Sequence, residues 1–309
     1  MNVIRFYERG QDNPSSLIVQ WNLGNTCNYS CTYCPTYLHS GNIQWPDLNL
    51  IKNTLLKIKE KFISNDITVE MLGGEITLYK DFIPLMKFLK ENNFSSNILS
   101  NGSRTLRFWG EASPYLNNIG LTYHSEFNNE EQLLGVIKTL TENNVTPYIK
   151  IAMVKEHFWN LIKFQKKIQQ EFPYINIEMV LLLDKMHQFK NNGYYYNYSR
   201  EEIEYLIASE EGTTGHLVAE YTDGLVESYT LNQVRDSGLN KFKGFECGSK
   251  LSLIIIDHKG NLSTSLCRQR PRISIHNIDT ELDSLLTPVI CELEKCVNHS
   301  DLRILKEKI

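Results

Sequence analysis

The chain has 309 residues, of which 41% are hydrophobic and 22% charged, with a formal net charge of −4. No apolar run approaches the length of a membrane span, and the charge gives no general attraction to nucleic acid, so neither partner is expected. The N-terminus lacks the apolar segment of a secretory signal, which predicts a cytoplasmic protein. The length of the chain predicts one large and one small domain.

Strands and helices alternate over the first part of the chain. Apolar runs predict six strands, at residues 16–23, 67–72, 97–100, 119–123, 146–154 and 175–183. Apolar residues at helical spacing predict helices at 48–62, 81–92, 130–143 and 156–172, and another at 106–118 that Pro114 breaks. This alternation predicts an α/β fold with a parallel sheet and outer helices. Six units are too few for an eight-fold barrel, and both a partial barrel and an open sheet fit.

Three cysteines follow the first predicted strand, where parallel sheets bind ligands. Cys27, Cys31 and Cys34 have the spacing C-x-x-x-C-x-x-C. Structural zinc sites and ordinary iron–sulfur clusters have four protein ligands, so three cysteines suggest a cluster with one open metal. The odd total of seven cysteines and the missing secretory signal oppose a disulfide framework. A zinc site completed elsewhere in the chain is the alternative.

The later strands also end in residues that could bind a ligand or act in catalysis. The second leads into Gly73-Gly74-Glu75-Ile76-Thr77, where paired glycines let the backbone approach a ligand and the glutamate offers a carboxylate. His124 and Glu126 follow the fourth strand as candidate acid–base catalysts, although a histidine there is often a plain hydrogen-bond donor. Lys150, in the fifth strand, is either a cation for a ligand carboxylate or a lysine that extends to solvent.

The cysteine spacing, with Tyr33 before the last cysteine, and the Gly-Gly-Glu run together resemble the radical S-adenosylmethionine (radical SAM) enzymes. The resemblance implies a partial (β/α)6 barrel of parallel strands. It also implies a 4Fe–4S cluster on the three cysteines, whose open iron binds S-adenosylmethionine. The residues implied to contact S-adenosylmethionine are Tyr33, Gly73, Gly74, Glu75, Thr77, Ser100, Asn101 and Lys150. Ile76 departs from the family, in which many members have proline at this position.

The resemblance further implies reductive cleavage of S-adenosylmethionine to a 5′-deoxyadenosyl radical, which takes a hydrogen atom from the substrate. An external donor of the flavodoxin or ferredoxin type is expected to supply the electron. Because the first predicted strand begins near residue 16, no N-terminal peptide-recognition module is evident. A small molecule or a short peptide is therefore the expected substrate.

After residue 184 the alternation stops. A tyrosine-rich stretch at 191–198 predicts a linker or lid, residues 200–209 a short helix, and turns near 223–224 and 258–261 two hairpins. The remaining cysteines are Cys247, Cys267, Cys291 and Cys296. Four cysteines can close an iron–sulfur or zinc site, and they can also be buried free thiols.

Cys247 and Cys267 bracket the second predicted hairpin, and this arrangement resembles the twitch extension, a shortened relative of the SPASM extension of radical SAM enzymes. The resemblance implies one auxiliary 4Fe–4S cluster in a small C-terminal α+β extension. The expected domains are a partial barrel at 1–185, a linker or specificity segment at 186–245 and a twitch-like domain at 246–309.

Together these features predict an oxidoreductase-type radical SAM enzyme that oxidises or cross-links its substrate with help from the auxiliary cluster. One alternative is a peptide epimerase, which needs a free cysteine as hydrogen donor. Full ligation of both clusters would use all seven cysteines and argue against that activity. An alternative of another class is a zinc-stabilised interaction protein without catalysis.

Overall fold

A computed structural model describes residues 2–10, 16–63, 66–184, 194–209, 216–248, 252–267 and 271–309. The chain divides into two compact units. Unit 1 comprises Met1–Asn22, Asn53–Thr68 and Ile207–Ile309, and unit 2 comprises Leu23–Lys52 and Val69–Leu206. We describe each unit by itself.

Unit 2 contains five of the six parallel strands that the sequence predicts. In sheet order they are β3 (Asp66–Leu72, whose first residues belong to unit 1), β4 (Ser95–Ser100), β5 (Asn118–Tyr123), β6 (Tyr148–Ala152) and β7 (Ile177–Val180). The pairs β4–β5, β5–β6 and β6–β7 are parallel. Because the residues of β3 and β5 are mostly buried, they read in the sequence as apolar runs.

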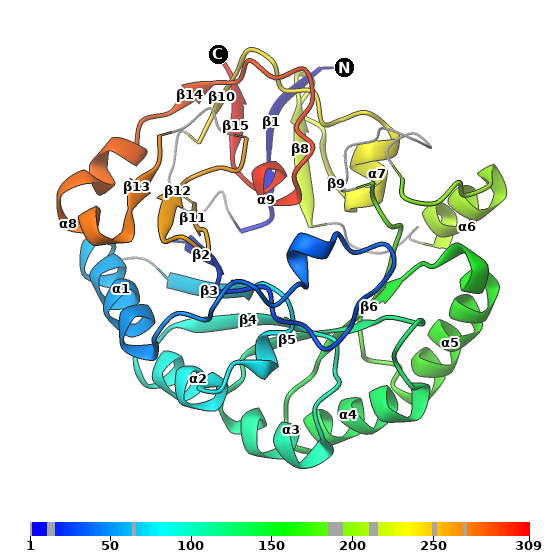
Figure 1. The fold of residues 1–309 in the computed structure, drawn as a ribbon. Coiled ribbons are helices and arrows are strands. Elements are labelled where there is room, and N and C mark those ends of the chain that lie inside the picture. The colour runs from blue at the N-terminus through cyan, green and yellow to red at the C-terminus, as the bar shows by residue number, and fades with distance from the viewer. Residues whose placement is uncertain are drawn as a thin grey trace. The chain divides into compact units, whose positions relative to one another are not determined.

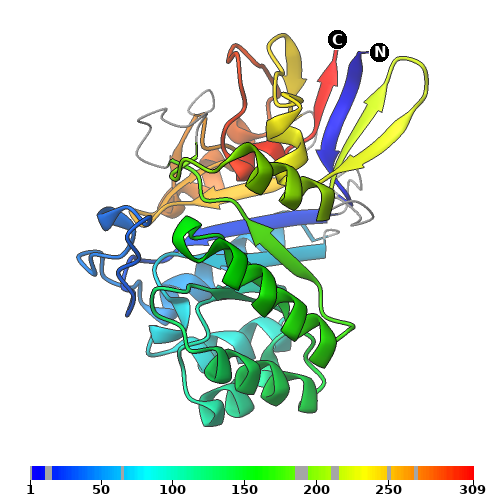
Figure 2. The same cartoon turned by 90° about the vertical axis from the view of Figure 1, so that its right-hand side faces the viewer.

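Helices accompany these strands along their outer side (Figures 1 and 2). They are α1 (Leu48–Lys61, which the division between the units cuts), α2 (Phe82–Glu91), α3 (Leu106–Ala112), α4 (Glu130–Glu142) and α5 (Phe158–Glu171). Leu133, Val136, Ile137 and Leu140 of α4 are fully buried at helical spacing, so this face packs in the core. Each helix matches a predicted one, and α3 ends at a 3₁₀ turn (Ser113–Tyr115) that contains Pro114.

Helices α2 and α4 end in the same way. Asn93 and Asn144 follow them with φ angles of 53° and 62°, in the left-handed region that asparagine tolerates. After α2, the N–H of Asn93 donates to the carbonyl of Lys90, and the N–H of Phe94 donates to that of Leu89. The corresponding bonds after α4 are made by Asn144 and Val145. These Schellman motifs turn the chain from helix to strand, and the printed sequence repeats Glu-Asn-Asn before an apolar residue at both places.

Unit 1 contains a six-stranded sheet that the sequence reading largely missed. Its order is β14 (Val289–Ile290), β10 (Phe245–Cys247), β15 (Lys306–Lys308), β1 (Val3–Glu8), β8 (Leu217–Tyr221) and β9 (Val226–Tyr229). All its neighbouring strands are antiparallel. Fully buried Phe6, Leu217, Phe242 and Leu302 belong to the core beside this sheet. The predicted first strand at residue 16 is therefore preceded by β1.

A second group of strands in unit 1 has the order β13 (Ile273–Ser274), β12 (Asn261–Ser263), β11 (Leu253–Ile256) and β2 (Ser16–Asn22), with β3 next. Strands β11 and β2 are parallel, and β11–β12 forms the hairpin predicted around Gly260. The hairpin β8–β9 is confirmed as well. Helix α6 (Arg200–Ser209) has the predicted bounds and lies across the division of the units, and α7 (Leu231–Asp236), α8 (Ile278–Glu281) and α9 (His299–Leu302) follow in unit 1.

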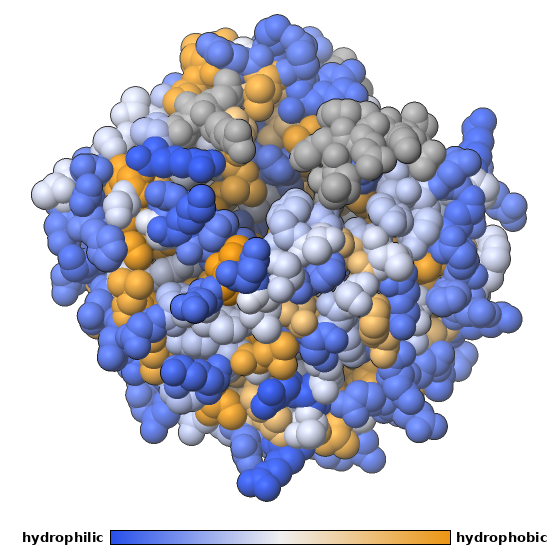
Figure 3. Space-filling model, in the orientation of Figure 1, coloured by the Kyte–Doolittle hydropathy of each residue, from blue (hydrophilic) through white to orange (hydrophobic). Residues whose placement is uncertain are grey.

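The α/β class with a partial barrel is confirmed, because all six predicted strands are present and the described strands do not close into a barrel. The boundaries predicted at residues 185 and 245 remain predictions. Figure 3 shows one face that is largely hydrophilic with small hydrophobic patches. In the described part of the chain, no helix combines the length and the apolar character needed to cross a membrane.

Candidate functional site

The cysteine loop, defined here as residues 26–34, follows β2 and belongs to unit 2. Cys31 is buried, and Cys27 and Cys34 are half-buried. Burial raises the pKa of the Cys31 thiol to about 11. A hydrogen bond with Tyr33 lowers this pKa, whereas negative charge on Cys34 and Cys27 raises it further. Burial likewise raises the pKa of Cys27, with a contribution from charge on Cys34. The three thiols are thus close enough to interact electrostatically, as ligands of one cluster would be.

The Gly-Gly-Glu run lies against the start of this loop. Gly73 and Gly74 have φ angles of 111° and 54°, which side-chain-bearing residues rarely adopt. A Cβ atom on Gly74 would lie 2.1 Å from the carbonyl oxygen of Thr26. The backbone N–H of Glu75 donates to that same oxygen at 2.8 Å. The structure therefore brings together the two motifs on which the family resemblance depends.

The Glu75 side chain is only 2% exposed and is used within the protein. Its Oε1 accepts from the N–H and the hydroxyl of Thr77, at 3.1 and 2.5 Å, and from the hydroxyl of Ser100 at 2.8 Å. Its Oε2 accepts from the backbone N–H of Asn101 at 2.6 Å. These bonds join the ends of β3 and β4. They leave the Gly-Gly backbone, rather than the carboxylate, as the part of the motif open to a ligand.

Asn101 extends this connection to the cysteines. Its side-chain Nδ2 donates to Oδ1 of Asn28 at 3.0 Å and lies 4.0 Å from the sulfur of Cys27. Its carbonyl accepts from the side chain of Asn128 at 2.8 Å, and Asn128 also accepts from the N–H of His124. Sequence reasoning missed Asn128, and its only sequence signal is a position four residues after His124.

His124 and Glu126, the predicted catalytic pair, both contact the cysteine loop. Nδ1 of His124 lies 2.6 Å from the hydroxyl of Tyr33, and the two rings stack with centroids 6.1 Å apart. Burial raises the pKa of Tyr33 well above its ordinary value, and charge on Cys31 adds to the rise, so its phenol stays protonated and can donate to His124. Glu126 accepts from the backbone N–H and the hydroxyl of Thr32. Both side chains thus hold the residues between the second and third cysteines.

Tyr195 is a further contact that sequence reasoning did not single out. Its hydroxyl donates to the carbonyl of Thr32 at 3.0 Å, and its ring meets Tyr33 edge-on at 6.4 Å. It belongs to the tyrosine-rich stretch predicted as a linker or lid, of which residues 191–193 lie outside the described residues. The tyrosine enrichment was the available signal.

Lys150 pairs with a residue of the neighbouring strand. Its Nζ forms an ion pair with Glu178 at 2.9 Å, and the two residues are Cα partners on β6 and β7. Its ammonium also lies 6.0 Å from the ring centre of Tyr148. The neighbouring strand therefore supplies a carboxylate partner for this lysine.

The other four cysteines belong to unit 1. Cys296 is buried, and burial raises the pKa of its thiol to about 12. The positive charge of Lys306 lowers this pKa. Negative charge on Asp301, Cys247 and Cys267 raises it. Cys291 donates its N–H to the carbonyl of Phe245, the first residue of β10, at 2.8 Å. Cys247, Cys267 and Cys296 thus lie near one another.

Two observations concern sites of other kinds. The described residues include no group of three or more His, Cys, Asp or Glu side chains placed to hold a single metal ion.

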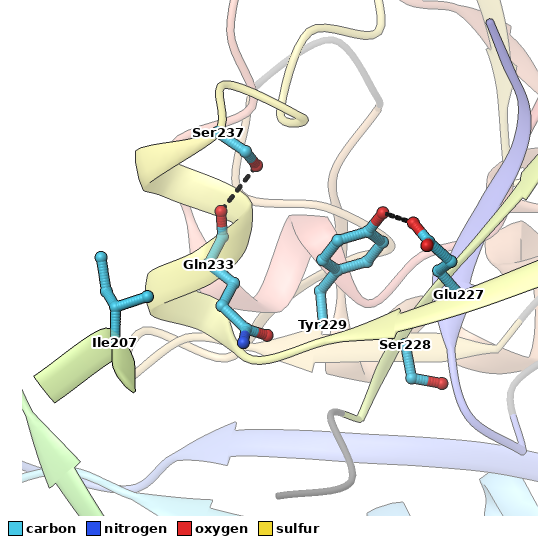
Figure 4. A pocket seen from close by; sticks show the side chains of 6 residues that line it. All are labelled: Ile207, Glu227, Ser228, Tyr229, Gln233 and Ser237. Carbon is cyan, nitrogen blue, oxygen red and sulfur yellow. Dashed lines mark hydrogen bonds between the residues drawn. The ribbon is translucent and has the colours of Figure 1, made fainter. Parts of the chain in front are cut away.

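A pocket of about 430 Å³ in unit 1 lies between β9 and α7, where the Tyr229 hydroxyl donates to Glu227 (Figure 4). Its lining residues are Ile207, Glu227, Ser228, Tyr229, Gln233 and Ser237, and none of them is a predicted site residue.

Comparison with known proteins gives a family match over part of the chain and solved structures with a similar fold. Residues 21–154 match the family model described as the Radical SAM superfamily. No curated protein matches the chain. The solved structure of native anSMEcpe with bound AdoMet and a Cp18Cys peptide has a TM-score of 0.57 at 14% sequence identity, covering 93% of this chain and 88% of that one. Native anSMEcpe with bound AdoMet alone gives a TM-score of 0.56 at 14% identity, covering 87% of this chain and 80% of that one. At this identity the likeness shows the fold.

Proposed function

We propose that the protein is a radical SAM enzyme, because residues 21–154 match the family model of the Radical SAM superfamily. In the proposed site, Cys27, Cys31 and Cys34 hold a 4Fe–4S cluster beside bound S-adenosylmethionine. The observation that carries the proposal is the packing of Gly74 on Thr26, one residue before the first cysteine, where a Cβ would meet the Thr26 carbonyl at 2.1 Å. This packing joins the cysteine loop to the glycine backbone that would receive the cofactor.

The residues present fit these cofactors. Thiols are the usual protein ligands of iron–sulfur clusters, and three of them leave one iron for another ligand. The two glycines leave backbone groups uncovered where a side chain would block a ligand. When bound, the cluster and S-adenosylmethionine supply a 5′-deoxyadenosyl radical, which takes a hydrogen atom from the substrate.

The chain's own residues then orient the cofactors and the substrate. Glu75 holds Ser100 and Asn101 in place, and Asn101 in turn reaches the sulfur of Cys27. Glu126 and His124 hold Thr32 and Tyr33. We therefore assign His124 and Glu126 to positioning of the cysteine loop, while an acid–base role toward the substrate remains a prediction. Lys150 belongs to the proposed cofactor site only if its pair with Glu178 opens.

We extend the proposal to unit 1, where Cys247, Cys267, Cys291 and Cys296 would hold one auxiliary 4Fe–4S cluster in a twitch-like extension. Such a cluster can accept an electron from the substrate radical, which supports oxidation or cross-linking as the net reaction. With all seven cysteines used as ligands, none is left to donate hydrogen in an epimerisation. An electron donor of the flavodoxin or ferredoxin type and a cytoplasmic location belong to the same proposal.

The substrate would be a small molecule or a short peptide. The peptide bound to anSMEcpe, which has this fold, supports a short peptide. The segment of unit 2 that reaches the cysteine loop through Tyr195 is the candidate for contact with it.

The proposal is tested with anaerobically purified protein. We expect brown protein with bound iron that releases 5′-deoxyadenosine from S-adenosylmethionine when a reductant is added. Cys27→Ala should abolish this release. Cys296→Ala should retain the release but change the spectroscopic signal of the auxiliary cluster. Colourless, zinc-loaded protein that leaves S-adenosylmethionine intact after cluster reconstitution would instead support the interaction-protein alternative.

A further inference from the structure

Lys306 is a lysine in the interior of unit 1. It lies on β15 and is only 1% exposed. Its Nζ donates to the carbonyls of Asp301 and Ile304, both at 2.6 Å, and to that of Leu302 at 3.3 Å. An ammonium has three donors, so these carbonyls use its capacity and fix its position. The ring centre of Phe242 lies 5.1 Å away and adds a cation–π contact.

The strand that carries this fixed charge pairs with the strand of one C-terminal cysteine. Lys306 and Cys247 are direct Cα partners in the antiparallel pair of β15 and β10. Lys306 also acts electrostatically on Cys296, where it opposes the effect of burial on the thiol. The connection to the third cysteine runs through Asp301, whose carboxylate accepts from the N–H of Leu266, the residue before Cys267, at 2.7 Å. The lysine is therefore linked to three of the four thiols.

We propose that Lys306 raises the reduction potential of an iron–sulfur cluster held by Cys247, Cys267, Cys291 and Cys296, which rests on the auxiliary cluster of the proposed function. Reduction adds one electron to the cluster, and a fixed positive charge nearby stabilises the more negative state. Because the ammonium is buried, salt screens this effect only weakly. A cluster held by these cysteines would supply an acceptor for the electron that the substrate radical would give up together with a proton on oxidation. A higher potential favours this transfer.

A purely structural role competes with this proposal, since Asp301 and Leu302 lie at the end of the short helix α9 and their carbonyls need donors. The test therefore separates charge from hydrogen bonding. Lys306→Met removes both while keeping an apolar chain that can pack on Phe242. Lys306→Gln keeps two donors and removes the charge. Lys308→Met is the matched control, because Lys308 lies on the same strand but is exposed.

The measurement is a redox titration followed by electron paramagnetic resonance, with iron content, in the full chain. Cys27→Ala, Cys31→Ala and Cys34→Ala are combined in every sample so that only the auxiliary cluster contributes. We expect both Lys306 variants to lower the ratio of reduced to oxidised cluster at a fixed potential about tenfold, the effect of one charge about 10 Å away at an effective dielectric constant of about 20. This equals about 59 mV for a one-electron couple. Lys308→Met should leave the ratio unchanged.

The outcomes distinguish the two levels of the proposal. An unchanged potential in Lys306→Gln, with full iron content, overturns the role of Lys306 and leaves the auxiliary cluster standing. Loss of folded structure in both Lys306 variants also overturns the proposed role in the potential, because that result would show that the lysine is needed for folding. If the triple-cysteine variant with Lys306 intact contains no iron, the auxiliary cluster is overturned, and this inference with it. Release of 5′-deoxyadenosine by the unmodified chain tests the first cluster separately.

Discussion

Glu126 binds both polar groups of Thr32: the backbone N–H donates to Oε2 at 2.8 Å, and the hydroxyl donates to Oε1 at 2.5 Å. Ninety-four positions separate these residues in the sequence. The bonds fasten the segment after β5 to the middle of the cysteine loop, between Cys31 and Tyr33. The geometry of the three thiols therefore depends on a residue outside the cysteine motif.

We expect Glu126→Ala to lower the rate of 5′-deoxyadenosine formation about tenfold. Hydrogen bonds to a charged group contribute about 1.5–3 kcal/mol, and the exposure of this pair reduces the figure. Glu126→Gln keeps one acceptor and should give an intermediate rate. Glu142→Ala, which changes an exposed residue of α4, is the control. Rates equal to the unmodified protein in Glu126→Ala would show that Thr32 needs no such support.

Gly74→Ala should prevent the Gly-Gly-Glu turn from packing on the cysteine loop. The left-handed φ of 54° alone costs about 1–2 kcal/mol for an alanine, and the added methyl meets backbone at 2.1 Å. We expect a loss of more than about 3 kcal/mol in the free energy of unfolding, measured by urea denaturation.

Gly110→Ala is the matched control for this substitution. Gly110 lies in α3, and an added Cβ meets nothing within 4 Å. The same chemical change there should stabilise the protein by about 0.5–1 kcal/mol, because alanine favours a helix. Equal effects at the two positions would contradict the close approach of Gly74 to Thr26.

Glu75→Gln should destabilise the protein although it hardly changes the side chain's size. Both carboxylate oxygens accept hydrogen bonds from buried donors, so an amide NH₂ would face a donor in either orientation. We expect a loss of about 2–4 kcal/mol in the free energy of unfolding. Glu91→Gln, at an exposed position of α2, should be neutral. A stable Glu75→Gln variant would contradict the hydrogen bonds that both carboxylate oxygens accept.

The metal-free protein should lose stability in alkali through its buried thiols. Burial raises the pKa of Cys31 to about 11 and that of Cys296 to about 12, against about 8.5 for a free thiol. The folded state holds these protons more tightly than the unfolded state. Their stabilisation is therefore complete below about pH 8.5 and is lost as the pH rises toward 11–12.

Urea denaturation of metal-free protein at pH 7.5 and pH 10.5 measures this loss, which we expect to be about 2–3 kcal/mol per thiol at most. Because tyrosines and lysines titrate in the same range, the comparison is with a Cys31→Ala and Cys296→Ala double variant. The double variant should lose less stability between the two pH values. The same pH dependence in both proteins would contradict the burial of these thiols.

The sequence predicted the parallel strands well because their buried residues form apolar runs between amphipathic helices. It missed β1, where Arg5 and Glu8 interrupt the apolar pattern, and it missed β10, β14 and β15, which have two or three residues each. So few residues show no periodicity. Their pairing depends on partners far away in the chain, such as Arg5 with Glu307.

The candidate site was predictable as far as spacing in the sequence determines it. The cysteine loop and the glycine turn follow consecutive strands, so their meeting could be anticipated from a parallel sheet. The use of the Glu75 carboxylate and the contacts of Asn128 and Tyr195 could not, because loop packing decides them. The Lys150 pair depends on the register between β6 and β7, which fixes Glu178 opposite the lysine.

The pairing of β1 with β15 has a consequence for synthesis of the chain. Residues 3–8 leave the ribosome long before their partner at residues 306–308. At about 5–20 residues per second, β1 waits roughly 15–60 s for that neighbour. Its other neighbour, β8, arrives about two thirds of the way through this interval. Meanwhile a strand edge stays open to wrong partners, so a chaperone that covers β1 on the nascent chain would be expected to raise the yield of folded protein.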